Sequence, residues 1–151
     1  MCRRGLQKKG GQAAQALGRS AGGFSTKIHT LTEALGQPLR FALTGGQVHD
    51  VTQAAALLGA YAGEYVIADR GYASAAFSEQ LEQQGIIPVI PPHPRSLMPQ
   101  WYDRALYKER HVIECFFNKL KHYRRVFTRF DKLAQRYLSF VHLVSTFIWL
   151  R

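Results

Sequence analysis

The stretch EYVIADRGYASAAFSEQLEQQGIIPVI, residues 64–90, decides the fold class of this chain. It opens with a short apolar run that ends on Asp69, as a buried strand does where it leaves a core. Residues 74–85 have the pattern of a helix, with Ser74 near its start and Gly85 at its stop. The run IIPVI then predicts a second strand, which a proline-rich loop ends. A strand, a helix and a strand in succession are typical of α/β proteins.

The flanking segments extend this alternation. Upstream, FSTKIHTLTEA and PLRFALTGG are candidate strands separated by the turn-like residues 35–38, which predicts a hairpin. Between the hairpin and residues 64–90, DVTQAAALLGAY predicts a helix whose N-terminus Asp50 would cap. Downstream, residues 107–121 and 131–150 predict two further helices. This order predicts a layered α/β domain, in which helices cover the faces of one mixed sheet.

The composition favours a polyanionic partner. The chain of 151 residues has a net charge of +10, which points to nucleic acid first and to an anionic membrane surface second. Residues 1–23 are rich in Gly, Gln, Ala and basic residues, and we expect a basic flexible arm there. Residues 24–151 are then expected to form one domain.

Features of the chain fit a cytoplasmic protein. Cys2 and Cys115 form no paired spacing, which argues against a disulfide framework or a zinc site and fits a reducing cytosol. The basic N-terminus has no apolar core behind it, so we expect no secretory signal. The apolar run near the C-terminus is short and carries polar residues, which predicts a buried core helix and no membrane span.

The helix predicted over residues 107–121 carries a polar stripe. At about 100° per residue, Tyr107, Arg110, Glu114 and Lys121 share a stripe roughly 60° wide, with a broad apolar face behind it. An ordinary amphipathic helix with an Arg110–Glu114 ion pair would produce this pattern. A carboxylate held in place for chemistry would produce it too, and the pattern alone leaves both interpretations open.

Asp69 is a second candidate carboxylate. It follows an apolar strand at the end where open sheets bind ligands, although an aspartate before Gly71 is also common in turns. If Asp69 and Glu114 converge in space, their oxygens suit Mg²⁺ or Mn²⁺. A pair of such ions activates water, or a DNA 3′-hydroxyl, for in-line attack on a phosphodiester.

A basic stretch with interleaved aromatic residues, KLKHYRRVFTRFDK, follows the stripe. Such a stretch suits phosphate contact combined with base stacking, and a solvated helix face with inward aromatics is the alternative. In the first case DNA would contact the stripe and the basic side chains together. These residues are Tyr107, Arg110, Lys119, Lys121, Arg124, Arg125 and Arg129.

These motifs together resemble the bacterial insertion-sequence transposases of the DDE type. The family signature Y-x2-R-x3-E-x6-K fits Tyr107, Arg110, Glu114 and Lys121 without a gap, and ADRGY is similar to the second catalytic aspartate motif, at Asp69. GRSAGGFSTKIH and LTGGQVHD resemble the preceding stretches in the insertion-sequence-five group. The resemblance implies an RNase H-like fold and a carboxylate triad that binds two Mg²⁺ or Mn²⁺ ions. It also implies cut-and-paste rearrangement of double-stranded DNA at transposon ends.

One departure from the family pattern changes these expectations. The family's first aspartate lies on the first strand, upstream of GRSAGGFSTKIH, whereas the first acidic residue of this chain is Glu33. In an RNase H-like sheet the first strand is central, and its absence leaves two unpaired strand edges. We therefore expect a partial catalytic domain over residues 24–151 that binds DNA but does not cleave it alone.

Three functions remain open at this point. The chain is either part of a transposase, completed by a fragment from an upstream reading frame, or a non-catalytic DNA-binding fragment that regulates an intact transposase through its DNA sites or as its dimer partner. An RNA binder of the ribosomal type fits the charge but leaves Asp69 and Glu114 unexplained. In the first two cases we expect the protein in the bacterial cytoplasm, at the nucleoid.

Overall fold

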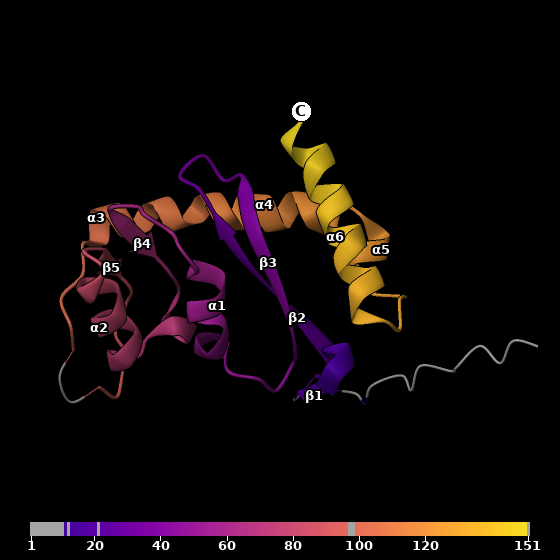
Figure 1. Ribbon diagram of the computed structural model, residues 1–151, viewed down its shortest axis with the longest axis horizontal. Coiled ribbons are helices and arrows are strands. Elements are labelled where there is room, and N and C mark those ends of the chain that lie inside the picture. The colour runs from indigo at the N-terminus through magenta and orange to yellow at the C-terminus, as the bar shows by residue number, and fades with distance from the viewer. Residues whose placement is uncertain (1–10, 12, 21, 97–98, 151) are drawn as a thin grey trace, which may run out of the picture.

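A long antiparallel hairpin lies in the middle of the molecule (Figure 1). Its strands are β2 (Gly23–Thr32) and β3 (Pro38–Gly45). The turn between them closes on Gly36, which has a φ of +84° and donates its N–H to the carbonyl of Glu33. The hairpin predicted from the sequence is therefore present. The structure is a computed structural model that describes residues 11, 13–20, 22–96 and 99–150.

Two short elements precede the hairpin. They are the 3₁₀ helix η1 (Ala13–Gln15) and strand β1 (Gly18–Ser20), which pairs antiparallel with the start of β2. Both fall within residues 1–23, where the sequence analysis expects a flexible arm without regular structure. Residues 1–10 of that arm lie outside the described residues. The division into an arm and a domain stays a prediction.

A second structural unit contains the stretch that decides the fold class. Strands β4 (Tyr65–Ile67) and β5 (Ile87–Val89) pair in parallel, and α2 (Ala75–Gln83) connects them after the 3₁₀ helix η3 (Arg70–Tyr72). Gly85 ends α2 as predicted, with a φ of +73°. Ser74 occupies the N-cap position of α2, but its side chain makes no capping hydrogen bond. The 3₁₀ helix η2 (Asp50–Gln53) and α1 (Ala54–Leu58) link this unit to the hairpin.

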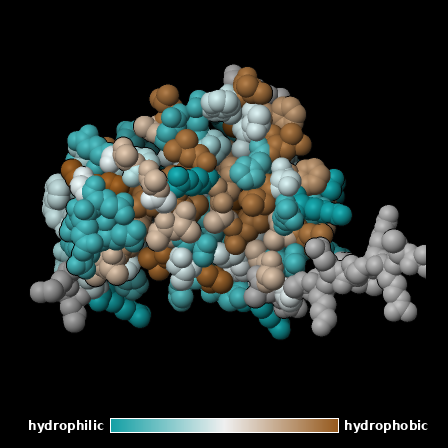
Figure 2. Space-filling model, in the orientation of Figure 1, coloured by the Kyte–Doolittle hydropathy of each residue, from teal (hydrophilic) through white to brown (hydrophobic). Residues whose placement is uncertain are grey.

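The helices downstream follow the predicted order with differences in detail. The helix predicted over residues 107–121 consists of α3 (Arg104–Tyr107), the 3₁₀ helix η4 (Lys108–Arg110) and α4 (His111–Lys121). A short helix, α5 (Arg124–Phe127), precedes α6 (Ala134–Trp149). One face of α6 is buried in the core. Leu143 and Phe147 on another face of the helix, and Leu150 just after it, are exposed, so the prediction of a buried core helix holds for one face only. Figure 2 shows apolar side chains gathered around the C-terminal end of α6.

The strands do not join into the one mixed sheet that the sequence predicts. Within the described residues, β1, β2 and β3 form one sheet and β4 and β5 form another. Two hydrophobic clusters follow this division. The first cluster is formed by side chains of β4, α1 and α2 and includes Leu58, Phe77 and Leu81. The second is formed by side chains of the hairpin, α4 and α6 and includes Phe116 and Val141. The α/β class is confirmed in this coarser form, as two small sheets with helices around them.

The helical run of α3, η4 and α4 extends from the β4–β5 unit across the hairpin to α5 and α6 (Figure 1). Among the described residues, no helix has both the length and the apolar character that crossing a bilayer would require.

Arg129 joins the N-terminal segment to the hairpin and to α6. Its guanidinium donates to the carbonyls of Gln15 (2.6 Å) and Ala16 (2.9 Å) and to the hydroxyl of Thr26, and it lies 5.0 Å from the ring centroid of Tyr137. Burial lowers the pKa of Arg129 from its ordinary value. The Arg129 side chain therefore stabilises the fold by connecting η1, β2 and α6.

His29 links the hairpin to the β4–β5 unit. It is only 4% exposed, and its ring nitrogens lie 2.7 Å from Thr44 Oγ1 on β3 and 3.0 Å from the Tyr72 hydroxyl on η3. Burial lowers the pKa of His29; Lys27 acts in the same direction, whereas Asp50 and Asp69 oppose the shift. Burial in the native protein therefore favours the neutral form of this imidazole.

We expect Arg129→Leu to lower the free energy of unfolding by about 1–3 kcal/mol, because the carbonyls of Gln15 and Ala16 would lose their donor. Arg124→Leu is the matched control: Arg124 is exposed, and its substitution should change the free energy of unfolding by less than about 0.5 kcal/mol. Urea titration followed by circular dichroism measures both. Equal effects of the two substitutions would contradict the structural role of Arg129.

The buried His29 also predicts a pH dependence of stability. Its folded pKa lies below the ordinary value of about 6.5, so near and below that pH the unfolded chain binds the proton more readily than the native one. The free energy of unfolding should therefore fall as the pH drops below about 6.5, with a slope of at most about 1.4 kcal/mol per pH unit for one proton. His29→Gln should reduce this slope, and His122→Gln, at an exposed position, should leave it unchanged. Urea titrations between pH 5 and 7.5, roughly the range in which histidine titrates, supply the measurement.

Candidate active site

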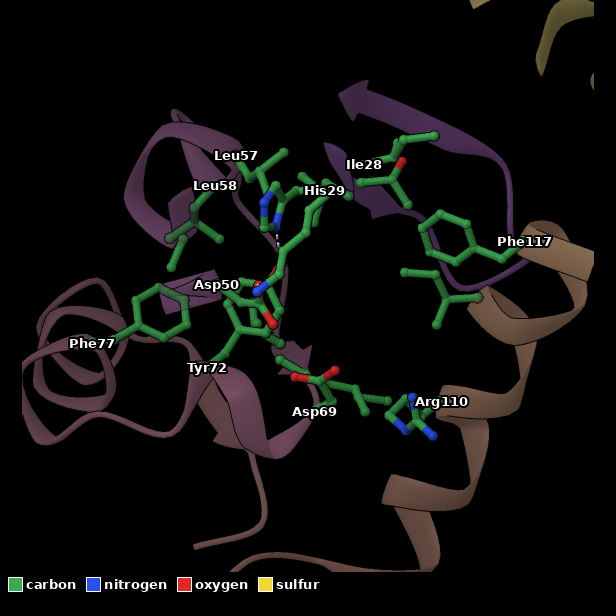
Figure 3. A pocket seen from close by; sticks show the side chains of 18 of the residues that line it. Ile28, His29, Asp50, Leu57, Leu58, Asp69, Tyr72, Phe77, Arg110 and Phe117 are labelled. Atoms are coloured by element: carbon green, nitrogen blue, oxygen red, sulfur yellow. Dashed lines mark hydrogen bonds and ion pairs between the residues drawn. The ribbon is translucent and has the colours of Figure 1, made fainter. Parts of the chain in front are cut away.

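A cavity of about 390 Å³ lies between the hairpin and the β4–β5 unit. Residues of β2, α1, α4 and the segment that follows β4 line it. Figure 3 shows two regions: Leu57, Leu58 and Ile28 lie along one side, and Asp69 and Arg110 lie on the other. The cavity is therefore mostly apolar, with a charged region at one side.

Asp69 lies in the charged region, two residues past the end of β4. Its backbone is extended, and its carboxylate Oδ1 accepts a hydrogen bond of 2.9 Å from the N–H of Gly71. Asp69 therefore takes part in a turn, as one interpretation of the sequence has it. It also lines the cavity, as the other requires. The two interpretations describe the same residue.

Asp50 lies beside Asp69, and the prediction that it caps a helix is wrong. Asp50 is the first residue of η2, and its Oδ1 accepts a hydrogen bond of 2.8 Å from Lys27 Nζ. A Cβ atom at Gly71 would meet Asp50 Oδ2 at 2.8 Å and Asp69 Oδ1 at 3.0 Å, so the two carboxylates crowd the same glycine. The sequence analysis did not identify this arrangement, because it did not pair Asp50 with Lys27, which lies 23 residues earlier on β2.

Two more residues that sequence reasoning missed line the cavity, Lys27 and Tyr72. Lys27 also donates to the carbonyl of Val48 at 2.8 Å. Burial raises the pKa of Tyr72, and the negative charges of Asp50 and Asp69 add to the shift, so the phenol stays protonated. The alternation of Lys27 and His29 with Thr26, Ile28 and Thr30 along β2 is the signal in the sequence that points to Lys27.

Glu114 enters the cavity from α4. Its carboxylate accepts a hydrogen bond from Arg110, one turn earlier, and both residues line the cavity. The Arg110 guanidinium lies 5.6 Å from the ring centroid of Tyr107. The intrahelical ion pair of the simpler interpretation therefore exists, and it stands on the cavity side of the helix.

The structure brings together some of the predicted site residues and separates others. Asp69, Arg110 and Glu114 line one cavity, and Tyr107 contacts Arg110. Lys121 is not among the residues that line the cavity; it is exposed at the last position of α4, about 10 Å along the helix from Glu114.

The remaining residues predicted to contact DNA differ in exposure and in whether other residues of the protein already bind them. Lys119 and Arg124 are exposed. Arg125 pairs with Asp131 at 3.2 Å and lies 3.7 Å over the ring of Phe140, although its side chain is still 55% exposed. A DNA contact by Arg129 would require it to give up the bonds to the N-terminal segment described above.

The donors in the cavity match a hard divalent cation in kind. Asp69 and Glu114 offer carboxylate oxygens, which Mg²⁺ and Mn²⁺ prefer. The third carboxylate, Asp50, is already paired with Lys27. Over the described part of the chain, no group of three or more His, Cys, Asp or Glu residues is arranged to hold a metal ion. The two carboxylates thus suit such an ion, but they fall one short of a triad.

Comparison with known proteins gives one consistent family. The family model described as "Transposase DDE domain" matches residues 5–145. The chain is 44% identical over 133 residues to the "Putative transposase for insertion sequence element IS6501" of Brucella ovis, a match that covers 85% of this chain and 100% of that relative. It is 34% identical over 130 residues to the "Putative transposase for insertion sequence element IS402" of Burkholderia cepacia, covering 78% of this chain and 59% of that relative.

No solved structure matches the chain. The family model nevertheless covers nearly all of the described residues, including the three carboxylates of the cavity, Asp50, Asp69 and Glu114. The chain therefore belongs to the insertion-sequence transposases with a DDE domain.

Proposed function

We propose that this chain is the C-terminal portion of a catalytic domain that cleaves phosphodiesters and transfers DNA strands at transposon ends. The observation that carries the proposal is the convergence of Asp69 and Glu114, from separate parts of the sequence, on one cavity. Asp69 and Glu114 would hold Mg²⁺ or Mn²⁺, which when bound supplies Lewis-acid activation of the attacking oxygen and of the phosphate. The resemblance implies two such ions.

The roles of the surrounding residues follow from their contacts. Arg110 orients the Glu114 carboxylate through the intrahelical bond and presents positive charge beside it, where a phosphate oxygen would approach. Gly71 fixes the position of the Asp69 carboxylate through its N–H. Lys27 neutralises Asp50 and leaves that carboxylate with less charge to offer a cation. Asp69 and Glu114 are accordingly the proposed metal ligands, and Asp50 is not.

DNA contact would extend from the cavity along α4 and α5. Lys119, Lys121 and Arg124 offer exposed cations, and the partly exposed Arg125 adds a fourth at the cost of its pairing with Asp131. Tyr107 supports Arg110 next to the strand to be cut. The expected partner is double-stranded DNA, and the expected location is the nucleoid in the bacterial cytoplasm.

We also propose that this chain alone binds DNA without cleaving it. Its unjoined sheets are compatible with an RNase H-like domain that lacks its first, central strand, and the cavity offers two candidate ligand carboxylates instead of three. The second candidate function, a DNA-binding fragment that regulates an intact transposase, is favoured by the same shortage of carboxylates. The two functions differ in whether supplying the missing strand restores cleavage.

Binding of the chain to a DNA duplex should weaken steeply with salt, because the contacts are to phosphates. Lys121→Ala should reduce the slope of log affinity against log salt by about 0.9, the value for one neutralised phosphate. Arg95→Ala, an exposed position in the proline-rich loop, should leave the slope unchanged. Fluorescence anisotropy over a salt series measures the slope, and a salt-independent affinity would contradict the proposal. In the same buffer with Mg²⁺ the chain should leave supercoiled plasmid intact.

Glu114→Gln should weaken the binding of Mn²⁺ by more than about tenfold, because it removes one of two charged ligands. The matched control is Glu109→Gln, an exposed residue of η4 that does not line the cavity. Electron paramagnetic resonance of free Mn²⁺ gives the affinity, and the DNA affinity of both variants at low Mn²⁺ should stay near that of the unsubstituted chain. Equal Mn²⁺ affinities for the two variants would refute the ligand role of Glu114.

A further inference from the structure

Asp69 lies where the regular hydrogen bonding between β4 and β5 ends. The last bond of this ladder runs from the N–H of Ala68 to the carbonyl of Val89, at 3.3 Å. Asp69 and the first two residues of η3, Arg70 and Gly71, are exposed. Because the hydrogen bonds of a 3₁₀ helix have poor geometry, the three residues of η3 do little to hold this turn by themselves. The position of the Asp69 carboxylate therefore depends on contacts outside η3.

Tyr72, the last residue of η3, supplies such a contact (Figure 3). Its backbone N–H donates to the carbonyl of Asp69 at 3.0 Å, and its ring packs against the first hydrophobic cluster. Its hydroxyl lies 3.0 Å from Nδ1 of His29 on β2. Burial raises the pKa of Tyr72, so the hydroxyl keeps its proton. Tyr72 therefore connects the turn at Asp69 to the hairpin.

His29 is itself held in place on the hairpin. It is buried, and its Nε2 lies 2.7 Å from Oγ1 of Thr44 on β3, the strand that pairs with β2. A neutral imidazole has one donor and one acceptor nitrogen, and in either tautomer the hydroxyls of Thr44 and Tyr72 can take the complementary roles. The rings of His29 and Tyr72 also meet edge to face, with their centroids 6.4 Å apart. Both strands of the hairpin thus support the contact to Tyr72.

The hairpin also holds the helix that carries Glu114. Ile28 of β2 packs against the second hydrophobic cluster, which includes Phe116 of α4. The ring of Phe41 on β3 lies 6.1 Å from the ring of Phe116, between centroids, and Phe116 comes two residues after Glu114. The hairpin is therefore a common support for both candidate ligands. Apolar packing places Glu114 against it, and hydrogen bonds place Asp69.

We propose that Tyr72, anchored by His29, is a positioning residue that fixes the Asp69 carboxylate so that Asp69 and Glu114 can bind one divalent cation together. Partners that orient a ligand in this way typically change metal affinity by about 10–100-fold. The inference rests on the proposed function only in assigning the cation to Asp69. The fixing of Asp69 by Tyr72 follows from the contacts alone.

Tyr72→Phe removes the hydroxyl and keeps the ring in its packing. It should weaken Mn²⁺ binding about tenfold, the lower end of the range for a lost supporting partner, as measured by electron paramagnetic resonance of free Mn²⁺. Should Tyr72→Phe fail to fold, His29→Leu breaks the same contact from the hairpin and should have the same effect.

Tyr137→Phe is the matched control for a purely structural effect. The Tyr137 hydroxyl is buried and donates to the carbonyl of Val126 at 2.7 Å, in the second cluster and away from Asp69. Its loss leaves a buried carbonyl without its donor and should lower the urea midpoint, but it should leave the Mn²⁺ affinity unchanged. Equal losses of Mn²⁺ affinity in Tyr72→Phe and Tyr137→Phe would overturn the inference.

A double substitution tests whether Tyr72 acts through Asp69. Asp69→Asn removes the charge of the ligand and keeps an oxygen that can accept the bond from Gly71. The double variant Asp69→Asn/Tyr72→Phe should bind Mn²⁺ no more weakly than Asp69→Asn alone, because the carboxylate to be positioned is already gone. A further tenfold loss in the double variant would show that Tyr72 acts by another route and would overturn the inference.

Amide hydrogen exchange without metal keeps the two proposals apart. The N–H of Gly71 bonds to the Asp69 carboxylate, so Tyr72→Phe should speed its exchange by at least about threefold, and Tyr137→Phe should not. Faster exchange in Tyr72→Phe, together with equal Mn²⁺ affinities of the chain and of Asp69→Asn, would uphold the positioning of Asp69 and refute the proposed catalytic site. Unchanged exchange and Mn²⁺ affinity in Tyr72→Phe, together with weaker Mn²⁺ binding by Asp69→Asn, would refute the positioning and uphold the site.

Discussion

The position of the candidate site depends on how the hairpin is held against the β4–β5 unit, and polar contacts do much of this. His29 reaches Tyr72, and Lys27 reaches Asp50. Arg40 of β3 donates to the carbonyls of Leu57 (3.0 Å) and Leu58 (2.5 Å) at the end of α1. Gly59, with a φ of +52°, allows this approach, because a Cβ atom there would collide with the Arg40 guanidinium. Each of these contacts starts on the hairpin and crosses to the other unit.

The same contacts determine which carboxylates remain available. Lys27 pairs with Asp50, so the ion pair that holds the units together also occupies the acid that crowds Gly71 together with Asp69. Glu114 comes from α4, in the helical run that extends from the β4–β5 unit across the hairpin, and its pairing with Arg110 leaves its side chain 55% exposed. Asp69 and Glu114 are therefore the acids that can turn to an added cation without breaking the link between the units.

The sequence predicts individual elements well where one residue forces the geometry. Gly36 and Gly85 have positive φ values at the predicted turn and helix end, and Asp69 lies just past a strand as expected. Predictions failed where a distant partner decides the role of a residue. Asp50 has the usual sequence context of a helix cap, but Lys27 on β2 takes its carboxylate. Arg129 belongs to a basic stretch, yet its donors serve the carbonyls of Gln15 and Ala16, more than a hundred residues earlier.

The presence of two hydrophobic clusters with no common buried residue has a consequence for cooperativity. Unfolding is cooperative when the loss of one part of the packing destabilises the rest. Here the two clusters are connected mainly by polar contacts and by the helical run that ends in α4. We therefore expect the two clusters to unfold with different midpoints. The effect of Arg129→Leu is then measured on the transition of the second cluster, which contains Tyr137.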